Sequence, residues 1–177
     1  MNSNIPLVSI IIINYNGLNL LKKCLSSLFE IDFLNYEIIL VDNNSTDDTI
    51  QYLTKNYPKI IIIKLEKNKG FAEPNNIASK IAKGEYLLFL NNDTIVTKNF
   101  LSELINSINK NTQIGICQSL LLKLDDSIDS SGDFIDELGV VYNSKTSVNS
   151  DRKISSARGA SMLIRKEIFN ELKGFDE

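Results

Sequence analysis

The sequence predicts an α/β fold: a mostly parallel central sheet flanked by helices, with a small antiparallel hairpin region in the second half. Three apolar runs, 10–13, 38–41 and 86–90, each end abruptly in amide or carboxylate side chains. Helical patterns separate these runs, and such alternation is typical of a parallel sheet with right-handed crossovers. The polar groups that follow the strands should therefore meet at one edge of the sheet, where open α/β folds bind ligands.

The first half alternates four predicted strands with three predicted helices. The strands are apolar runs, mostly β-branched or leucine-rich, as expected of buried parallel strands: 8–13, 37–41, 60–65 and 86–90. The helices are 19–29, with apolar residues at helical spacing, a segment that ends near residue 56 before Pro58, and 76–82, which ends before Gly84. Ser45 is the expected N-cap of the middle helix, with Asp48 as its capping-box partner.

The sequence of the second half does not continue the regular alternation of strands and helices seen in the first half. An amphipathic helix is expected at 100–109, a strand at 114–124 and a hairpin at 134–142 that turns at Leu138-Gly139. The polar stretch 143–153 is expected to be a loop. A further strand at 157–164 and a short helix at 166–172, ended by Gly174, complete the chain.

Composition narrows the classes of function. The 177 residues suit one domain, and the net charge of −3 provides no basic surface for nucleic acid. No run approaches the ~18 apolar residues of a membrane span, and no secretory signal is recognisable. Two cysteines are too few for a disulfide or metal framework. The absence of histidine excludes Ser-His-Asp and Cys-His schemes, so acid–base chemistry would depend on carboxylates.

Asp42 and Asp93 are the two acids that follow buried strands. Either could simply cap the next helix, but amides accompany both, more than capping requires. One carboxylate together with amides and ligand phosphates is a normal donor set for Mg²⁺ or Mn²⁺. Such a metal would neutralise a diphosphate as it departs. We therefore interpret Asp93 as the metal ligand and Asp42 as an acceptor for the ring N–H of uracil or thymine.

Two further segments are candidates for contacts with a nucleotide. Tyr15 is suited to packing near a base or ribose, although half-buried tyrosines are common at strand ends. The segment 68–76 places a glycine and several amides at a strand–loop–helix junction, where the helix amino terminus could receive phosphate. An ordinary loop with an asparagine cap explains that segment equally well. It is neither a Walker A loop nor a dinucleotide fingerprint.

Five motifs in order resemble family 2 glycosyltransferases, and within them the rhamnosyltransferase-like branch. They are Asn14-Tyr15-Asn16-Gly17, 41–47, 68–76, 84–93 and 157–164, with the turn Gly174-Phe175-Asp176-Glu177 after them. The resemblance covers essentially the whole chain. It implies one GT-A domain over 1–177, with a nucleotide-binding half at 1–96 and the start of an acceptor-side half at 97–177.

The resemblance also implies roles for individual residues. Asp93 would be the metal-contacting acid of an Asp-x-Asp-type motif in which Asn91 stands where many relatives have aspartate. Arg158, Gly159 and Ala160 would lie near the donor sugar or acceptor. The nucleotide-binding residues would be Asn14, Tyr15, Asn16, Asp42, Asn44, Asn68, Gly70, Asn75, Asn91 and Asn92. The catalytic base of the family is expected beyond Glu177, so this chain should bind nucleotide and transfer sugar poorly.

The function expected on these grounds is inverting transfer from a UDP- or dTDP-sugar, with Mn²⁺ or Mg²⁺ as cofactor. The acceptor would be a glycan or a lipid-linked glycan of bacterial cell-surface polysaccharide synthesis. We expect a cytoplasmic protein at the inner face of the membrane, peripherally associated with it, and a homodimer. A non-catalytic nucleotide-binding or interaction module is the alternative. A nucleotidyltransferase should have a basic, glycine-rich loop after the first strand, and a receiver domain should have a pair of acids there. Residues 14–17 form neither a basic, glycine-rich loop nor an acid pair.

Overall fold

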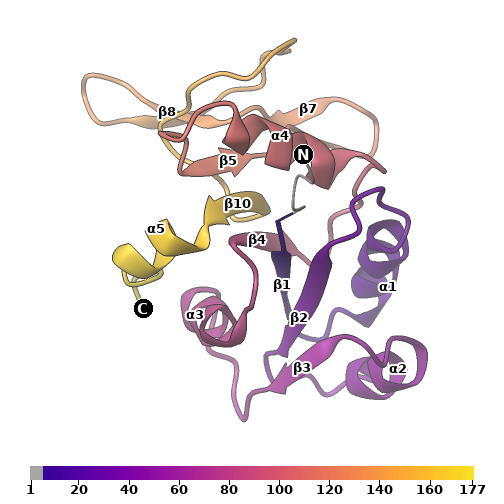
Figure 1. Ribbon diagram of the computed structural model, residues 1–177. Helices are drawn as coiled ribbons and strands as arrows, with labels where there is room; N and C mark the ends of the chain where they lie inside the picture. Colours follow the sequence, from indigo (N-terminus) through magenta and orange to yellow (C-terminus); the bar gives the residue numbers. More distant parts are fainter. Residues whose placement is uncertain (1–5) are drawn as a thin grey trace, which may run out of the picture.

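A six-stranded sheet forms the centre of the computed structural model, which describes residues 6–177 (Figure 1). The strand order is β3-β2-β1-β4-β10-β5. The first four strands in the chain are parallel to one another: β1 (Val8–Asn14), β2 (Tyr36–Asp42), β3 (Ile61–Lys64) and β4 (Tyr86–Asn91). β10 (Ser161–Arg165) is antiparallel to both β4 and β5 (Ile116–Gln118). The predicted α/β class with a mostly parallel sheet is confirmed.

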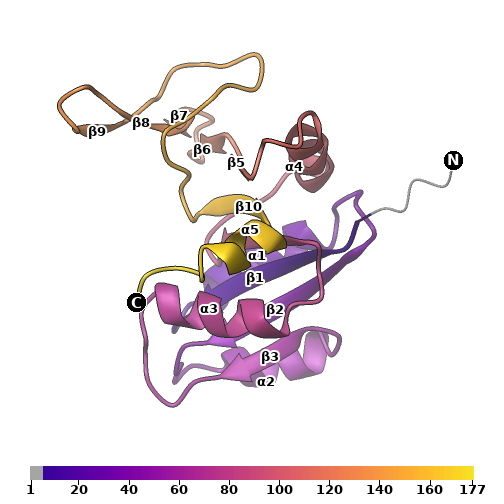
Figure 2. The same ribbon diagram turned by 60° about the vertical axis from the view of Figure 1, so that its left-hand side comes forward.

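Helices cover both faces of the sheet (Figure 2). One face packs against α1 (Leu18–Leu28), α2 (Thr49–Asn56) and α4 (Phe100–Asn109), and the other against α3 (Ala72–Ile81) and α5 (Lys166–Glu171). Alternate residues of each central strand belong to opposite apolar clusters, as a pleated strand requires. Within the described part of the chain, no helix combines the length and the apolar character needed to cross a bilayer.

Two small antiparallel sheets project from the central sheet (Figure 2). β6 (Leu121–Leu122) pairs with β7 (Ile128–Ser130), and β8 (Asp133–Ile135) pairs with β9 (Val141–Asn143). The predicted hairpin is confirmed, and its turn lies in the segment predicted from Leu138-Gly139. The strand β7 was not predicted, because its three residues carry no hydrophobic alternation.

Two predicted strands of the second half are shorter than expected. The run 114–124 is divided into β5 and β6, because the Ser119 N–H makes a last hydrogen bond to the Ser161 carbonyl of β10 at 3.2 Å and β6 then pairs with β7 in a separate sheet. The strand predicted to start at residue 157 begins at Ser161 instead. In the segment before it, the N–H of Arg158 donates to Gln118 Oε1 at 2.7 Å, a side-chain contact that interrupts the backbone ladder.

Helix α3 begins four residues before the predicted start at residue 76. Pro74 is the third residue of the helix, and the first-turn positions of a helix have no intrahelical acceptor for their N–H groups. Proline is therefore tolerated there, and the helix extends back to Ala72. This extension brings the segment 68–71 directly to the amino terminus of α3.

Candidate functional site

The carboxyl ends of β1, β2 and β4 lie side by side. In the register of the sheet, Asn14 is opposite Asp42, and Ile13 is opposite Asn91. The three polar clusters that the sequence places after separate strands therefore meet at one edge. The segment 68–71 adjoins this edge because the side chain of Asn43, next to Asp42, is hydrogen-bonded to it.

The candidate residues divide into a buried group and an exposed group. Asn14, Asp42 and Asn75 are at most 4% exposed. Asn91 and Asn92 are half-buried. The exposed residues form the outer part of the edge: Tyr15, Asn16, Asn44, Asn68, Gly70 and Asp93. Direct contact with a ligand is open to the exposed group, whereas the buried amides of Asn14 and Asn75 act through their neighbours.

Asn14 is fully buried, and both ends of its amide are hydrogen-bonded. Its Oδ1 accepts from Asn92 Nδ2 at 2.7 Å, while its Nδ2 donates to Thr49 Oγ1 at 3.2 Å and to Ser45 Oγ at 3.3 Å. Gly17 packs directly against the Asn14–Asn92 pair. One side chain at the end of β1 therefore connects the turn after β4 to the start of α2.

The prediction that Ser45 caps α2 is wrong. The helix begins at Thr49 with Asp48 at the N-cap position, and Ser45 lies in the preceding loop. Ser45 Oγ instead accepts a hydrogen bond from the Asn16 N–H at 3.0 Å as well as from Asn14. Asn16 has a positive φ of 50°, a conformation that asparagine tolerates better than most residues. The hydroxyl thus joins the loops after β1 and β2.

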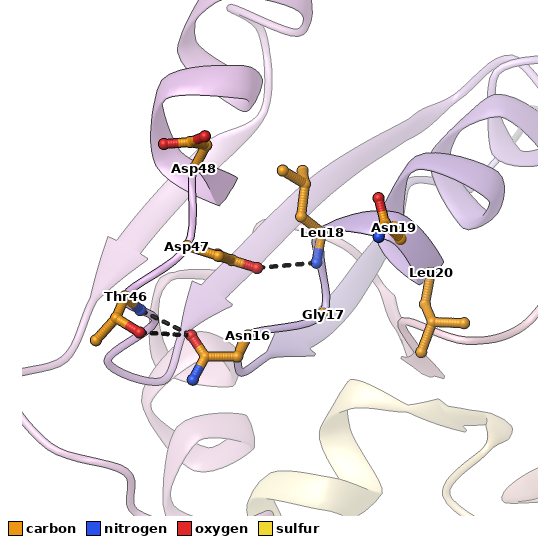
Figure 3. Close-up of a pocket in the computed structure, with 8 residues that line it drawn as sticks. All are labelled: Asn16, Gly17, Leu18, Asn19, Leu20, Thr46, Asp47 and Asp48. Carbon is orange, nitrogen blue, oxygen red and sulfur yellow. Dashed lines mark hydrogen bonds between the residues drawn. The ribbon is translucent and has the colours of Figure 1, made fainter.

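Asp47 connects the amino termini of two helices. Its Oδ2 accepts the Leu18 N–H of α1 at 3.1 Å, and its Oδ1 accepts the Thr49 N–H of α2 at 3.1 Å. Burial acts to raise the pKa of this carboxyl, but the hydrogen bonds from Thr49 and Leu18 outweigh it and lower the pKa below its ordinary value. Figure 3 shows Asp47 between the two loops, beside the Thr46–Asn16 hydrogen bonds and in the wall of an open pocket of about 580 Å³.

Replacing Asp47 with alanine is expected to destabilise the fold by about 1–2 kcal/mol, because two helix amino termini lose an acceptor. Since the folded carboxyl has a lowered pKa, its contribution is complete above the unfolded value of about 4. The contribution disappears as the pH falls through the folded value. Urea unfolding of both proteins at pH 7 and pH 3 measures this difference. An equal difference at the two pH values would contradict the assignment.

Asp42 retains one free acceptor atom. Its Oδ2 accepts the Ser45 N–H at 3.2 Å, whereas Oδ1 is buried and has no hydrogen-bond partner. A buried oxygen without a donor is costly, which is a reason to expect a ligand or water group there. Asp42 lies two residues after Leu40 on β2 and therefore faces the side of the sheet covered by α1 and α2.

Asn43 is a site residue for which the sequence analysis found no role. It is 2% exposed, and its Nδ2 donates to Asn68 Oδ1 and to the Gly70 carbonyl, both at 2.9 Å. Its Oδ1 accepts the Lys69 N–H at 2.9 Å. These three bonds hold the segment 68–70 against the end of β2. The polarity of Asn43 at a strand end was the available signal, but its partners are 25 or more residues away in the chain.

The three candidate residues before β10 lie in different surroundings. The carbonyl of Ala160 accepts the Asn91 N–H at 3.1 Å, which places it beside the turn after β4. Gly159 packs against the ring of Phe71, just before α3. The guanidinium of Arg158 is directed elsewhere, because its Nε lies 3.1 Å from Asp133 Oδ2 in the antiparallel region. Gly159 and Ala160 adjoin the polar edge, whereas Arg158 is engaged in an ion pair.

Asp93 is exposed, and its carboxylate accepts no hydrogen bond from the described residues. Cys24 lies near it and donates to the Asn91 carbonyl at 3.7 Å. Burial raises the pKa of this thiol to about 11, with a smaller contribution from the Asp93 charge, and the hydrogen bond to Thr94 only partly offsets the rise. A neutral thiol is not a metal ligand. Residues 6–177 contain no group of three or more metal-ligating side chains, so Asp93 fits a hard cation that takes most of its ligands from phosphate and water.

Comparison with known proteins identifies relatives that are longer than this chain. A poly(ribitol-phosphate) beta-glucosyltransferase of Bacillus spizizenii is 40% identical over 95 residues, which are 50% of this chain and 15% of the relative. A UDP-Glc:alpha-D-GlcNAc-diphosphoundecaprenol beta-1,3-glucosyltransferase, WfaP of Escherichia coli, is 43% identical over 88 residues, which are 49% of this chain and 35% of the relative. Less than two thirds of either relative is therefore represented here.

The fold is that of the GT-A glycosyltransferases. A structure of the mannosyltransferase PcManGT from Pyrobaculum calidifontis in complex with GDP-Man and Mn²⁺ superposes with a TM-score of 0.73 at 18% identity, over 98% of this chain and 48% of the other. None of these three proteins is named as a rhamnosyltransferase, and that branch stays a prediction. The family model for glycosyl transferase family 2 matches residues 9–173. The chain therefore belongs to glycosyl transferase family 2.

Proposed function

We propose that the chain binds a nucleoside-diphosphate sugar and belongs to a glycosyltransferase of bacterial cell-surface polysaccharide synthesis. One observation carries this proposal above the others. The ends of three adjacent strands converge on an edge where Asp93 is exposed without a hydrogen bond and Asp42 has a buried oxygen without a donor. An anionic donor with a divalent cation and a hydrogen-bond donor on its base would satisfy both groups.

The nucleotide would be a pyrimidine, UDP or dTDP. Asp42 Oδ1 would accept the ring N–H that uracil and thymine share, and cytosine lacks this donor. Tyr15 is 51% exposed, so its ring is available for packing against the base or ribose. The remaining contacts would come from Asn16, Asn44, Asn68, Gly70, Asn91 and Asn92, with Asn75 and Asn14 supporting them from below.

The metal site proposed here consists of Asp93 and the diphosphate of the donor. Mg²⁺ or Mn²⁺, when bound, would neutralise the charge that develops on the departing diphosphate. Asp93 would hold the ion at the edge, and the half-buried amides of Asn91 and Asn92 would orient the phosphate oxygens. Gly159 and Ala160 would line the donor-sugar side. Arg158 would contribute there only if its ion pair with Asp133 opened.

No described residue is assigned the role of catalytic base. Glu177 follows the Gly-Phe-Asp turn, and its Oε1 accepts a hydrogen bond from Asn76 Nδ2 at 2.9 Å. A carboxylate held in this way stabilises the turn. Inverting transfer needs a base for the acceptor hydroxyl, which typically contributes about 10²–10⁴-fold to the rate. The 177 residues are therefore proposed to bind donor and to transfer sugar weakly by themselves.

The acceptor proposed is a polyol-phosphate polymer or a lipid-linked glycan. The names of the two relatives describe acceptors of these kinds, a poly(ribitol-phosphate) and a diphosphoundecaprenol-linked sugar. We also propose a cytoplasmic protein in peripheral contact with the inner face of the membrane, where a lipid-linked acceptor would be accessible. A homodimer is a further proposal that sedimentation would test.

Calorimetric titration with UDP, dTDP and GDP, each with and without Mn²⁺, tests this function. We expect metal-dependent binding of a pyrimidine diphosphate and at least about a 100-fold loss in Asp93→Ala, since even residues behind a metal ligand reach that magnitude. Asp48→Ala is the matched control, because Asp48 is also an exposed carboxylate at this edge and makes no side-chain cap hydrogen bond. Equal binding by wild type and Asp93→Ala would refute the metal role.

A non-catalytic binding module is the second candidate, because no described residue is assigned the role of catalytic base. Both candidates predict nucleotide binding, so transfer distinguishes them. Release of UDP or dTDP from a donor sugar on addition of acceptor, measured with the Asp93→Ala variant as blank, would exclude the second candidate. Robust transfer by these residues alone would also refute the weak transfer proposed above.

A further inference from the structure

We propose that Asn14 is a positioning residue for Asp93, acting through Asn92, and that it does not itself contact nucleotide. The inference rests on the proposed function, since it assigns a role within the proposed metal site. Asn14 is 0% exposed and therefore offers no surface to a ligand. Its place at the end of β1, between β2 and β4, gives it access to the loops that follow both neighbours.

The amide of Asn14 connects the turn after β4 to the start of α2, and among the described residues Asn92 makes no other side-chain hydrogen bond. Asn92 Nδ2 donates to Asn14 Oδ1 at 2.7 Å, a short hydrogen bond between groups 78 residues apart. On the opposite side, Asn14 Nδ2 donates to Thr49 Oγ1 and Ser45 Oγ at 3.2 and 3.3 Å. In this arrangement the amide oxygen of Asn14 faces the Asn92 donor and its nitrogen faces two hydroxyl acceptors, so both ends of the buried amide are hydrogen-bonded.

The turn that carries Asp93 is short and depends on a few hydrogen bonds. The Thr94 hydroxyl donates to the Asn91 carbonyl at 2.7 Å, and the Asn91 N–H donates to Ala160 at 3.1 Å. These bonds fix the two ends of the turn. Between them, the Asp93 carboxylate has no hydrogen bond from the described residues, so its direction follows from the turn. The Asn92–Asn14 bond is the one that holds the middle of the turn against the sheet.

A polar group behind a metal ligand commonly sets how tightly the ion is held. Loss of such an outer partner typically lowers metal affinity by about 10–100-fold. Asn14→Ala removes the acceptor of Asn92 and should allow the turn to move. We therefore expect the Mn²⁺ concentration for half-maximal binding, at a fixed saturating concentration of UDP or dTDP, to rise at least about tenfold. Manganese electron paramagnetic resonance measures this directly, without any transfer reaction.

Thr49→Val is the matched control, because it separates a loss of protein stability from a change in Mn²⁺ binding. It removes one of the two hydroxyl partners of the Asn14 amide, keeps the shape of the side chain and leaves the Asn14–Asn92 bond in place. A merely structural role predicts that both variants lose thermal stability and that neither changes the Mn²⁺ requirement. A positioning role predicts that the Mn²⁺ requirement changes in Asn14→Ala alone. Equal requirements in the two variants would overturn the proposal.

Two further outcomes keep this test separate from the test of the proposed function. If wild type shows no metal-dependent binding of any diphosphate, the proposed function fails before Asn14 is tested. If Asn14→Ala does not fold, Gly17→Ala breaks the same hydrogen bond without replacing Asn14, because its new methyl group would overlap Asn92 Nδ2 and lie 2.7 Å from Asn14 Oδ1. An unaltered Mn²⁺ requirement in a folded Gly17→Ala protein would also overturn the proposal.

Discussion

Gly84→Ala is expected to cause the largest loss of stability among single substitutions at the glycines of this chain. A Cβ atom at position 84 would lie 2.5 Å from the Ser9 backbone nitrogen and 2.7 Å from the Tyr86 carbonyl oxygen. Both are backbone atoms of strands in the centre of the sheet, so neither can rotate away. Overpacking of this kind costs about 3 kcal/mol or more, at the upper end of the usual range.

The methyl group would also disturb hydrogen bonds at the amino ends of the strands. Ser9 Oγ accepts the Gly84 N–H at 2.8 Å and donates to Glu37 Oε1 at 2.6 Å. Thermal unfolding should show a decrease in the midpoint of about 5–10 °C. Gly115→Ala is the control, because its Cβ would meet only the flexible end of Ile168. Similar midpoints for the two variants would contradict the explanation.

Gly17→Ala is expected to cause the largest loss of metal-dependent binding among single substitutions at the glycines of this chain. A Cβ at this position would overlap Asn92 Nδ2 and lie 2.7 Å from Asn14 Oδ1. These atoms end side chains, and the half-buried Asn92 can rotate toward solvent. The Asn92–Asn14 hydrogen bond would then be lost, which costs about 1–3 kcal/mol because Asn14 Oδ1 stays buried. Nucleotide binding should require at least about tenfold more Mn²⁺.

Asn19→Ala provides the comparison for Gly17→Ala. It introduces alanine in the first turn of the same helix, on an exposed side chain in the wall of the pocket, and does not touch the Asn14–Asn92 pair. The same manganese titration and a thermal scan should be applied to both proteins. Gly17→Ala should retain most of its thermal midpoint and lose metal-dependent binding. A large loss of stability together with unchanged binding per folded molecule would refute this expectation.

The sequence predicted the sheet and the convergence of the polar clusters because both depend on local patterns. An apolar run followed by amides defines the end of a strand, and right-handed crossovers place consecutive strand ends on one edge. The same reasoning identified Asp42, Asp93 and the segment 68–76. The bounds of β1, β2 and β4 agree with the predicted runs to within one residue at each end.

The division of tasks within the site could not be predicted, because it depends on contacts between distant residues. Ser45 has the correct type and spacing for a helix cap, yet its hydroxyl bonds to the loop after β1, about 30 residues earlier. Asp47 performs the capping and also reaches α1. Asn14 and Asn16 differ by two positions, but one is fully buried and the other exposed. Side-chain type alone does not distinguish these situations.

The ring of Phe71 has a consequence for exchanging parts between related enzymes. It packs on Gly159, and its centroid lies 5.6 Å from that of Phe175, so one aromatic side chain from the first half of the chain contacts two segments near the end of the second half. β10 likewise pairs with β4 across the two halves of the sequence. A chimera joined at residue 96 would take Phe71 from one parent protein and its contact residues Gly159 and Phe175 from the other. A chimera that folds should therefore take Phe71, Gly159 and Phe175 from the same parent protein.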